Sequence, residues 1–302
     1  MQQPEVTVVI TTRNRPSLVA GAIDSALDQT VGPIEVVVVD DASTQPVRPA
    51  RADERLRLLR IERPRGVCAA RNAGLATARG RWITFLDDDD RLLPDMLAVS
   101  LETARTSPLP PPVAGLSAIQ EVDEEDRPIR VLRPATLARR LGAGAPTAPP
   151  AHATLVVPTE VVRAIGGWDE RLRAWEHTDF FLRLRPACSV QGVERITYLR
   201  RVHRRRLSEN LPARVDGMWR TLAKHEAAFT SHPRSRARYL GAIGISWLRM
   251  GRWDLAVAAT TAGLRAAPAR PKGVAQWLAS LAGPRAWAML ATVHRAFRRR
   301  SA

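Results

Sequence analysis

The segment Ile34–Val39 reads IEVVVV and is followed directly by Asp40 and Asp41. A run that is apolar on both faces is typical of a parallel strand buried between two layers of helices. A second β-rich run, VTVVIT, occupies Val6–Thr11, and the helical pattern of Pro16–Gln29 separates the two runs. Strand, helix and strand in this rhythm predict an α/β sheet with right-handed crossovers.

The same alternation continues beyond the second strand. The patterns predict a strand over Leu56–Ile61, a helix of small residues over Val67–Ala78 and a strand over Trp82–Leu86. Ligands of open α/β sheets bind beyond the carboxyl ends of the strands. We therefore expect one edge of the sheet to collect the polar clusters that follow three of these strands, namely Thr12–Arg15, Asp40–Asp41 and Asp87–Asp90.

The middle of the chain continues the α/β pattern, and the last third is helical. Further strands are expected over Val113–Val122, Pro128–Leu132, His152–Val157 and Val190–Leu199, and a helix over Trp175–Leu184. From about Leu211 onward the pattern is helical, with a pair of helices at Tyr239–Met250 and Trp253–Ala266. We predict a mostly parallel sheet flanked by helices over residues 1–208, and an all-helical extension over residues 209–302.

The composition is that of a folded protein with an unusual excess of arginine. Of 302 residues, 45% are hydrophobic and 25% charged, and the formal net charge is +16. This charge fits either a compositional bias or attraction to an anionic partner such as a nucleotide or a membrane surface. Because no nucleic-acid-binding motif accompanies the basic stretches, we expect no nucleic-acid partner.

Cysteine usage and the amino terminus bear on the cellular compartment. Cys68 and Cys188 lack metal-ligand spacing, and we expect them to be buried free thiols in a reducing compartment. No signal peptide is evident, and no uninterrupted apolar stretch reaches the length that spans a membrane. We expect a cytoplasmic protein, which either contacts the cytoplasmic face of the membrane or makes no contact with the membrane.

Four adjacent carboxylates at Asp87–Asp90 require an explanation, because like charges repel one another. Mg²⁺ is usually held by one or two carboxylates together with substrate phosphates, and a short acidic turn at a strand end suits that role. The other interpretation is a solvated loop, or one paired with a nearby arginine such as Arg91. The expected position of the turn, on the same edge as Asp41, favours the metal site.

Four motifs in order resemble the family 2 glycosyltransferases of the GT-A fold. They are TVVITTRNR at Thr7–Arg15, EVVVVDDAST at Glu35–Thr44, RNAG at Arg71–Gly74 and GRWITFLDDDD at Gly80–Asp90. GGWDE at Gly166–Glu170 and WEHTDFFLRL at Trp175–Leu184 are similar to the acceptor-side segments of the family. The resemblance reaches roughly Ser208 and leaves the last ninety or so residues uncovered.

This resemblance implies roles for particular residues. Asp89, in the DXD motif Asp87–Asp89, would hold Mn²⁺ or Mg²⁺ against the donor diphosphate, with Asp87 in support and His203 nearby as a further ligand. Asp41 would hydrogen-bond the nucleotide base. The nucleotide-sugar site as a whole would comprise Thr11, Thr12, Arg15, Asp41, Arg71, Asp87 and Asp88.

An inverting transfer also needs a general base to remove the proton of the acceptor hydroxyl. The family usually places an aspartate where this sequence has His177, so the chain departs from the pattern here. Histidine can act as a base at neutral pH, and Glu176 and Asp179 are the other candidates. These residues also suit a simple capping role at the start of a helix.

The resemblance implies a non-processive, inverting transfer of a sugar from a nucleotide-diphosphate sugar, most commonly UDP, to a hydroxyl acceptor. We expect the acceptor to be a cell-envelope glycan, a glycolipid or a polysaccharide precursor. The alternative is a binding or scaffold protein that kept the fold and lost catalysis, since His177 replaces the usual aspartate. Gly273–Arg300 suits either an interfacial helix on anionic lipid or ordinary packing.

Overall fold

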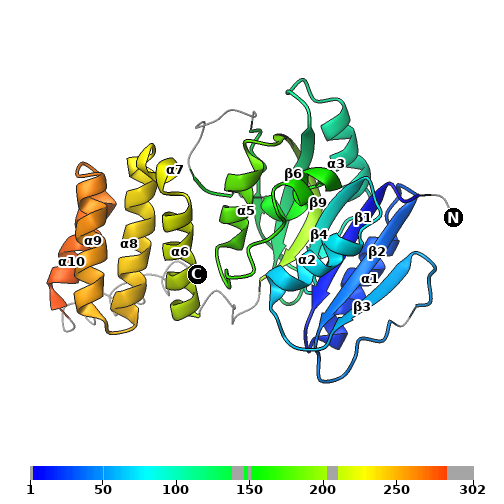
Figure 1. Cartoon of the computed structure of the whole chain (residues 1–302), viewed down its shortest axis with the longest axis horizontal. Coiled ribbons are helices and arrows are strands. Elements are labelled where there is room, and N and C mark those ends of the chain that lie inside the picture. Colours follow the sequence, from blue (N-terminus) through cyan, green and yellow to red (C-terminus); the bar gives the residue numbers. More distant parts are fainter. Residues whose placement is uncertain (1–2, 50, 138–145, 149–150, 203–209, 284–302) are drawn as a thin grey trace. The chain divides into compact units, whose positions relative to one another are not determined.

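The computed structural model describes residues 3–49, 51–137, 146–148, 151–202 and 210–283. The chain divides into two compact units, one made of residues 1–143 and 147–206 and the other of residues 144–146 and 207–302. The described part of the first unit is α/β, and that of the second is helical (Figure 1). The expected boundary at residues 208–209 falls in a stretch outside the described residues.

The first unit is built on a five-stranded sheet with the order β3-β2-β1-β4-β8. Its first four strands are parallel, and β8 is antiparallel to β4. The mostly parallel sheet predicted from the sequence is therefore confirmed. The strands are β1 Val6–Thr12, β2 Ile34–Asp41, β3 Leu56–Ile61, β4 Trp82–Asp87 and β8 Val157–Pro158.

Helices α1 (Pro16–Leu27) and α2 (Val67–Thr77) both pack on β1 and β2. Every residue of these two strands is buried, which is why their sequences are almost continuously apolar. A Cβ added at Gly74 of α2 would lie 2.4 Å from Val9 Cγ1. The glycine of the RNAG motif thus allows α2 to approach the strand that carries the site.

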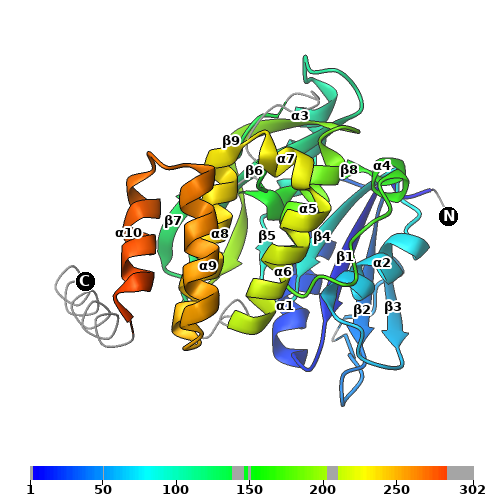
Figure 2. The ribbon, with the colours of Figure 1, turned by 60° about the vertical axis from the view of Figure 1, so that its left-hand side comes forward.

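A second, four-stranded sheet has the order β5-β9-β6-β7, with β6 and β9 parallel and the other pairs antiparallel (Figure 2). Helix α3 (Met96–Arg105), which the sequence patterns did not predict, packs on β6 and β9. The strands are β5 Arg91–Leu92, β6 Val113–Val122, β7 Pro128–Leu132 and β9 Ser189–Arg201, and the remaining helices of this unit are α4 Thr159–Ala164 and α5 Glu176–Leu184.

The strand predicted over His152–Val157 is wrong. The chain forms a short 3-10 helix, η1, over His152–Thr154, and only Val157 and Pro158 pair with β4. The physical reason lies in Thr154, whose Oγ1 accepts a hydrogen bond from Ser117 N at 2.9 Å and donates to Ser117 O at 2.8 Å. The side chain of Thr154 thus links η1 to β6, and backbone pairing with β6 begins only at Val156, which bridges to Gly115.

The described part of the second unit consists of helices packed on one another. α8 and α9 form the helix pair that the sequence predicted, and Gly251 with φ 75° lies in the turn between them. Within the described ranges, no helix is long and apolar enough to cross a membrane. The helices are α6 Leu211–Lys224, α7 Glu226–Thr230, α8 Pro233–Arg249, α9 Trp253–Ala266 and α10 Pro271–Leu281.

Candidate active site

The carboxyl ends of β1, β2 and β4 bring the three polar clusters together, as predicted. Thr12 is paired in register with Asp40 of β2, and Thr11 is paired with Asp87 of β4. β1 lies between the other two strands, so the acidic turn after β4 faces the loop after β1. The candidate site is built outward from this edge.

In the acidic turn, Asp88 and Asp89 are held by the loop that follows β1. Thr12 Oγ1 donates to Asp88 Oδ2 at 2.6 Å, and Arg15 Nη1 donates to Asp88 Oδ1 at 3.0 Å. The same Nη1 lies 3.1 Å from Asp89 Oδ2. Burial raises the pKa of Asp88 in spite of these donors. A single guanidinium thus bridges two carboxylates of the DXD motif.

Asp90 anchors the acidic turn to the second sheet. Tyr198 OH donates to Asp90 Oδ2 at 2.8 Å, and Arg201 N donates to Asp90 Oδ1 at 2.9 Å. Burial, together with the charges of Asp87 and Asp89, raises the pKa of Asp90 well above its ordinary value. Asp90 therefore has a structural role, and the remaining three carboxylates face the site.

Arg71 lies beneath the site as a buried cation, with only 3% of the residue exposed. Its Nη2 donates to Asp87 Oδ1 at 2.7 Å, and its Nη1 lies 3.7 Å from Glu176 Oε1. The guanidinium carbon stands 4.4 Å from the ring centroid of Trp168. Desolvation acts to raise the pKa of Asp87, but the nearby charges, with Arg71 first among them, and the hydrogen bond from Arg71 together lower this pKa below its ordinary value. Arg71 thus links Asp87 of the acidic turn to Glu176 of α5.

The three candidate bases lie in different surroundings. Glu176 and His177 line a cavity, and His177 Nε2 is 3.5 Å from Glu176 Oε1. Burial and the nearby charge of Arg71 lower the pKa of His177 to about 3, so its imidazole is neutral at physiological pH. Asp179 is fully buried, and its Oδ2 accepts from Arg183 Nε at 2.9 Å and Nη2 at 2.7 Å.

The cavity beside Glu176 has a volume of about 380 Å³. Sequence reasoning missed one of its lining residues, His152, whose ring centroid is 4.1 Å from that of His177. Trp175 also lines it and adopts φ 67°, a left-handed conformation that is uncommon outside glycine and that clusters at functional sites. The lining residues are Leu132, Thr147, Ala148, His152, Trp175, Glu176, His177, Thr178 and Arg200.

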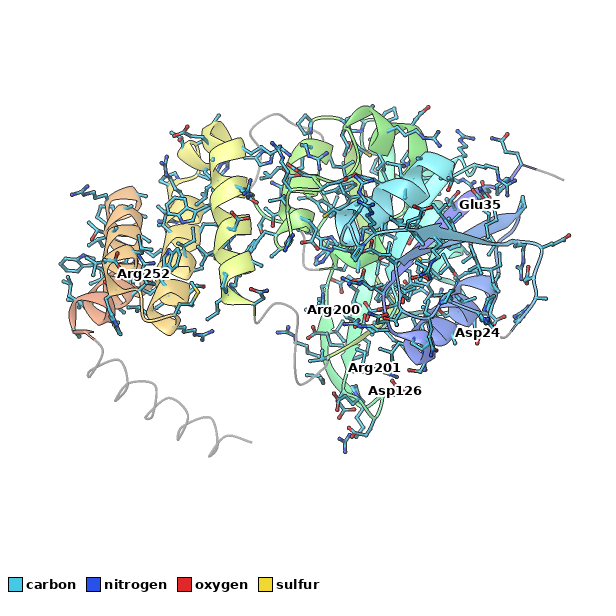
Figure 3. The ribbon with its side chains drawn as sticks, turned by 60° about the horizontal axis from the view of Figure 1, so that its bottom comes forward. Asp24, Glu35, Asp126, Arg200, Arg201 and Arg252 are labelled. Carbon is cyan, nitrogen blue, oxygen red and sulfur yellow. The ribbon has the colours of Figure 1, made fainter. Side chains whose placement is uncertain are left out.

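Arg200 closes one side of this cavity and was not predicted either. It lies on β9 and pairs with the buried Glu121 of β6. Its neighbour Arg201 pairs with Asp126 at the β6–β7 turn (Figure 3). Trp168, within the motif Gly166–Glu170, is stacked on Phe180 in the core at a centroid distance of 4.4 Å.

The loops at the nucleotide end of the site are tied to each other. Ser43 Oγ accepts from Asn14 N at 2.9 Å, and Asn14 Oδ1 accepts from Thr44 N at 2.7 Å. Asp41, expected to contact a nucleotide base, accepts from the backbone N–H groups of Arg65 and Gly66, both at 2.8 Å. Its carboxylate thereby orders the loop that enters α2.

The acidic turn meets the requirements of a cation bound together with a diphosphate. The part of the chain that the structure describes contains no cluster of three or more His, Cys, Asp or Glu that could hold a metal by itself. The side chains of Asp87 and Asp89 are 43% and 19% exposed, whereas that of Asp88 is only 7% exposed. Two reachable carboxylates suit Mg²⁺ or Mn²⁺ when phosphate oxygens complete the shell. His203, the third expected ligand, lies outside the described residues.

Comparison with known proteins identifies the class. Residues 7–137 match the family model described as Glycosyl transferase family 2. The succinoglycan biosynthesis protein ExoO of Rhizobium meliloti (strain 1021) is 41% identical over 139 residues, which cover 45% of this chain and 39% of that protein. The putative teichuronic acid biosynthesis glycosyltransferase TuaG of Bacillus subtilis (strain 168) is 34% identical over 105 residues, covering 33% of this chain and 42% of that protein.

Two solved structures share the fold at low sequence identity. One is S. aureus TarS 1–349 in complex with UDP-GlcNAc, with a TM-score of 0.55, 15% identity, and coverage of 94% of this chain and 92% of that one. The other is the mannosyltransferase PcManGT from Pyrobaculum calidifontis in complex with GDP-Man and Mn²⁺, with a TM-score of 0.55, 20% identity, and coverage of 91% and 79%.

Residues 7–137 of the chain match the family 2 glycosyltransferases, and the first unit has the GT-A fold. The matched region makes up 39% and 42% of the length of ExoO and TuaG. The comparisons therefore give the fold and the family that this segment matches, and the reaction of the chain is inferred below from its own residues.

Proposed function

We propose that this protein transfers a sugar from a nucleotide-diphosphate sugar, with UDP as the expected nucleotide, to a hydroxyl acceptor. The transfer inverts the configuration of the anomeric carbon and is non-processive. The observation that carries the proposal is the acidic turn, where Asp87 and Asp89 remain reachable at the sheet edge while Glu176 and His177 line an adjoining cavity. Donor-side and acceptor-side groups are thus neighbours, and Arg71 contacts both.

Asp87 and Asp89 would hold Mn²⁺ or Mg²⁺, and Thr11, Thr12, Arg15 and Asp41 would surround the nucleotide. The cation, when bound, stabilises the negative charge that develops on the leaving diphosphate. The chain keeps Asp87 in place through Arg71, which lies behind it. It fixes the acidic turn as a whole through the hydrogen bond of Tyr198 to Asp90.

Glu176 is the general base that the geometry favours. It lines the cavity, and its Oε1 is 3.5 Å from His177 Nε2 and 3.7 Å from Arg71 Nη1, so that it is held near both without a close hydrogen bond to either. A histidine with a pKa of about 3 is a weak proton acceptor, and we assign His177 the task of orienting Glu176. Asp179 is committed to Arg183 and supports the helix.

The acceptor we propose is a saccharide or a lipid-linked saccharide of a cell-envelope or exported polysaccharide. The names of two relatives support this class, since ExoO is a succinoglycan biosynthesis protein and TuaG a putative teichuronic acid biosynthesis glycosyltransferase. A cavity of about 380 Å³ has room for the terminal sugar of such an acceptor. We also propose that the protein acts in the cytoplasm, as a peripheral partner of the inner membrane surface.

A second candidate function is nucleotide and metal binding without turnover. The observation in its favour is His177, which stands where the family usually has its aspartate base and whose pKa of about 3 makes it a poor substitute. This candidate predicts normal donor binding with no transfer, and no effect of Glu176→Gln on any measured rate.

Calorimetric titration of UDP, GDP and dTDP with and without Mn²⁺, on the wild type and on Asp89→Ala, tests the donor site. We expect metal-dependent binding of one nucleotide that Asp89→Ala abolishes. The matching sugar donor is then assayed for turnover with wild type, Glu176→Gln and His177→Gln. Failure of all three nucleotides to bind would remove both candidate functions, whereas binding without turnover would select the second.

A further inference from the structure

Arg15 occupies an unusual place in the candidate donor site. Its Nη1 lies 3.0 Å from Asp88 Oδ1 and 3.1 Å from Asp89 Oδ2, so one cation bridges two adjacent carboxylates of the turn. Its side chain is 35% exposed, whereas those of Asp88 and Asp89 are 7% and 19% exposed. The guanidinium is therefore the outer, more accessible partner of this cluster.

The position of Arg15 conflicts with that of a metal ion. Asp89 is the carboxylate that we assign to the cation, and Arg15 already neutralises it. Arg15 occupies one oxygen of Asp89, and the repulsion between two cations a few ångströms apart weakens the binding of a metal ion beside it. Asp87 is paired with Arg71, but the side chain of Arg71 is only 4% exposed and lies behind the carboxylate, so that Asp87 remains reachable.

Arg15 also has an alternative partner once a donor is present. Guanidinium groups bind phosphate oxygens through a planar fork of donors, and a diphosphate offers several such oxygens. Arg15 precedes α1, with its backbone at φ −134° and ψ 57° just before Pro16, and the length of its side chain lets it change partner without a change in the helix.

We propose that Arg15 is a positioning residue that makes cation binding depend on the donor nucleotide. It holds Asp89 in place of the cation when no donor is bound, and it exchanges Asp89 for the diphosphate when the donor and the cation enter together. The inference rests on the proposed function and adds a dependence between the two ligands. The cation binds weakly by itself and binds tightly when the nucleotide is present.

The experiment measures Mn²⁺ binding by the loss of the free-ion paramagnetic resonance signal, without nucleotide and with saturating UDP or GDP. The variants are Arg15→Ala and Arg15→Gln, which both remove the charge while Gln keeps a polar side chain. The matched control is Arg13→Ala, which removes the same charge from an exposed side chain of the same loop. Thermal unfolding of each variant confirms that it is folded.

We expect the Arg15 variants to bind Mn²⁺ alone at least about tenfold more tightly than the wild type, by the size of single-charge effects at this distance. With nucleotide present they should bind Mn²⁺ more weakly than the wild type, because the diphosphate has lost a partner. Arg13→Ala should change neither affinity. The substitutions would then raise the Mn²⁺ affinity without nucleotide and lower it with nucleotide. This opposite effect would support an exchange of partners, because a purely structural role of Arg15 would not produce it.

Two other results would overturn the inference in distinguishable ways. If the wild type binds Mn²⁺ with nucleotide but the Arg15 variants bind Mn²⁺ alone no more tightly, the donor site stands and the exchange does not occur. If no form of the protein binds Mn²⁺ with either nucleotide, the proposed function itself fails, and the exchange fails with it.

Discussion

At the scale of single residues, the site is organised by arginines that each hold one or two carboxylates. Arg15 bridges Asp88 and Asp89, and Arg71 holds Asp87. Charges buried in a protein are costly unless they are paired, so each of these contacts fixes a side chain as well as a charge. Part of the arginine excess seen in the sequence therefore serves the interior of the protein, rather than an external anionic partner.

Asp179 and Glu176, three residues apart on α5, should respond differently to loss of charge. Asp179→Asn leaves Arg183 as a buried cation without its carboxylate, which should lower the free energy of unfolding by about 3 kcal/mol or more. Glu176→Gln should leave stability nearly unchanged and reduce transfer by at least about a hundredfold, the size expected for a general base. Urea denaturation and initial rates measure the two effects. Equal destabilisation by both substitutions would contradict this division of roles.

The neutral imidazole of His177 predicts a pH dependence of stability. Its pKa falls from 6.5 to about 3 on folding, so between these values the unfolded chain binds a proton that the folded chain does not. Stability from this group is complete above pH 6.5 and is lost as the pH falls toward 3. Between pH 7 and pH 5 the wild type should lose about 2 kcal/mol more than His177→Gln. Parallel urea-denaturation series at the two pH values test this, and identical losses would refute it.

The carboxylates of the site could be predicted from sequence because they follow strands directly, and strand ends fix their position. The partners of those carboxylates could not be predicted. Arg71 contacts Asp87 and Glu176 from a helix, and His152 reaches His177 from a 3-10 helix 25 residues earlier in the chain. Such contacts depend on how two elements are oriented in space, and no spacing in the sequence encodes that orientation.

At the scale of elements, apolar runs decided which predictions succeeded. β1, β2, β6 and β7 were predicted to within two residues at each end, since burial on both faces or a clear turn marks them. η1 was taken for the start of a strand because the apolar residues Leu155–Val157 follow it, while the hydrogen bonds of Thr154 to β6 decide its conformation. Helix α3 was missed because the acidic turn and Pro94 directly before it favour a loop interpretation of this stretch.

Thr154→Val should destabilise the segment that carries His152. The substitution keeps the shape of the side chain but leaves Ser117 N without its acceptor, which should cost about 1–3 kcal/mol. Thr103→Val is the matched control, because its hydroxyl donates only to Val99 O within helix α3. Chemical denaturation of both variants measures the difference. If Thr103→Val were destabilised as much as Thr154→Val, the hydrogen bonds to β6 would contribute no more to the free energy of unfolding than a bond within a helix.

At the scale of the whole molecule, the two units have separate cores, and every described residue assigned to the site belongs to the first unit. The sequence places a boundary at residues 208–209 because the strand patterns end before Leu211, and this boundary stays a prediction. The task of the helical unit could not, since its residues carry no motif that the family match covers.

Scanning calorimetry should therefore resolve two unfolding transitions, one for each unit. Saturating nucleotide with Mn²⁺ should raise the midpoint of one transition by several degrees, because a ligand that binds only the folded form stabilises it by mass action. The midpoint of the other should stay unchanged, and Asp89→Ala should abolish the shift. A single transition, or an equal shift of both, would mean that the units unfold as one.

The reciprocal contacts between Asn14, Ser43 and Thr44 have a consequence for redesign of the protein. The loops after β1 and β2 stabilise each other, since each supplies a side-chain oxygen that accepts a hydrogen bond from a backbone N–H of the other. Exchanging the donor base for another by altering one loop would leave the opposite loop without its hydrogen bonds. A change of nucleotide preference, in the laboratory or in evolution, would need both loops to be replaced as a single cassette.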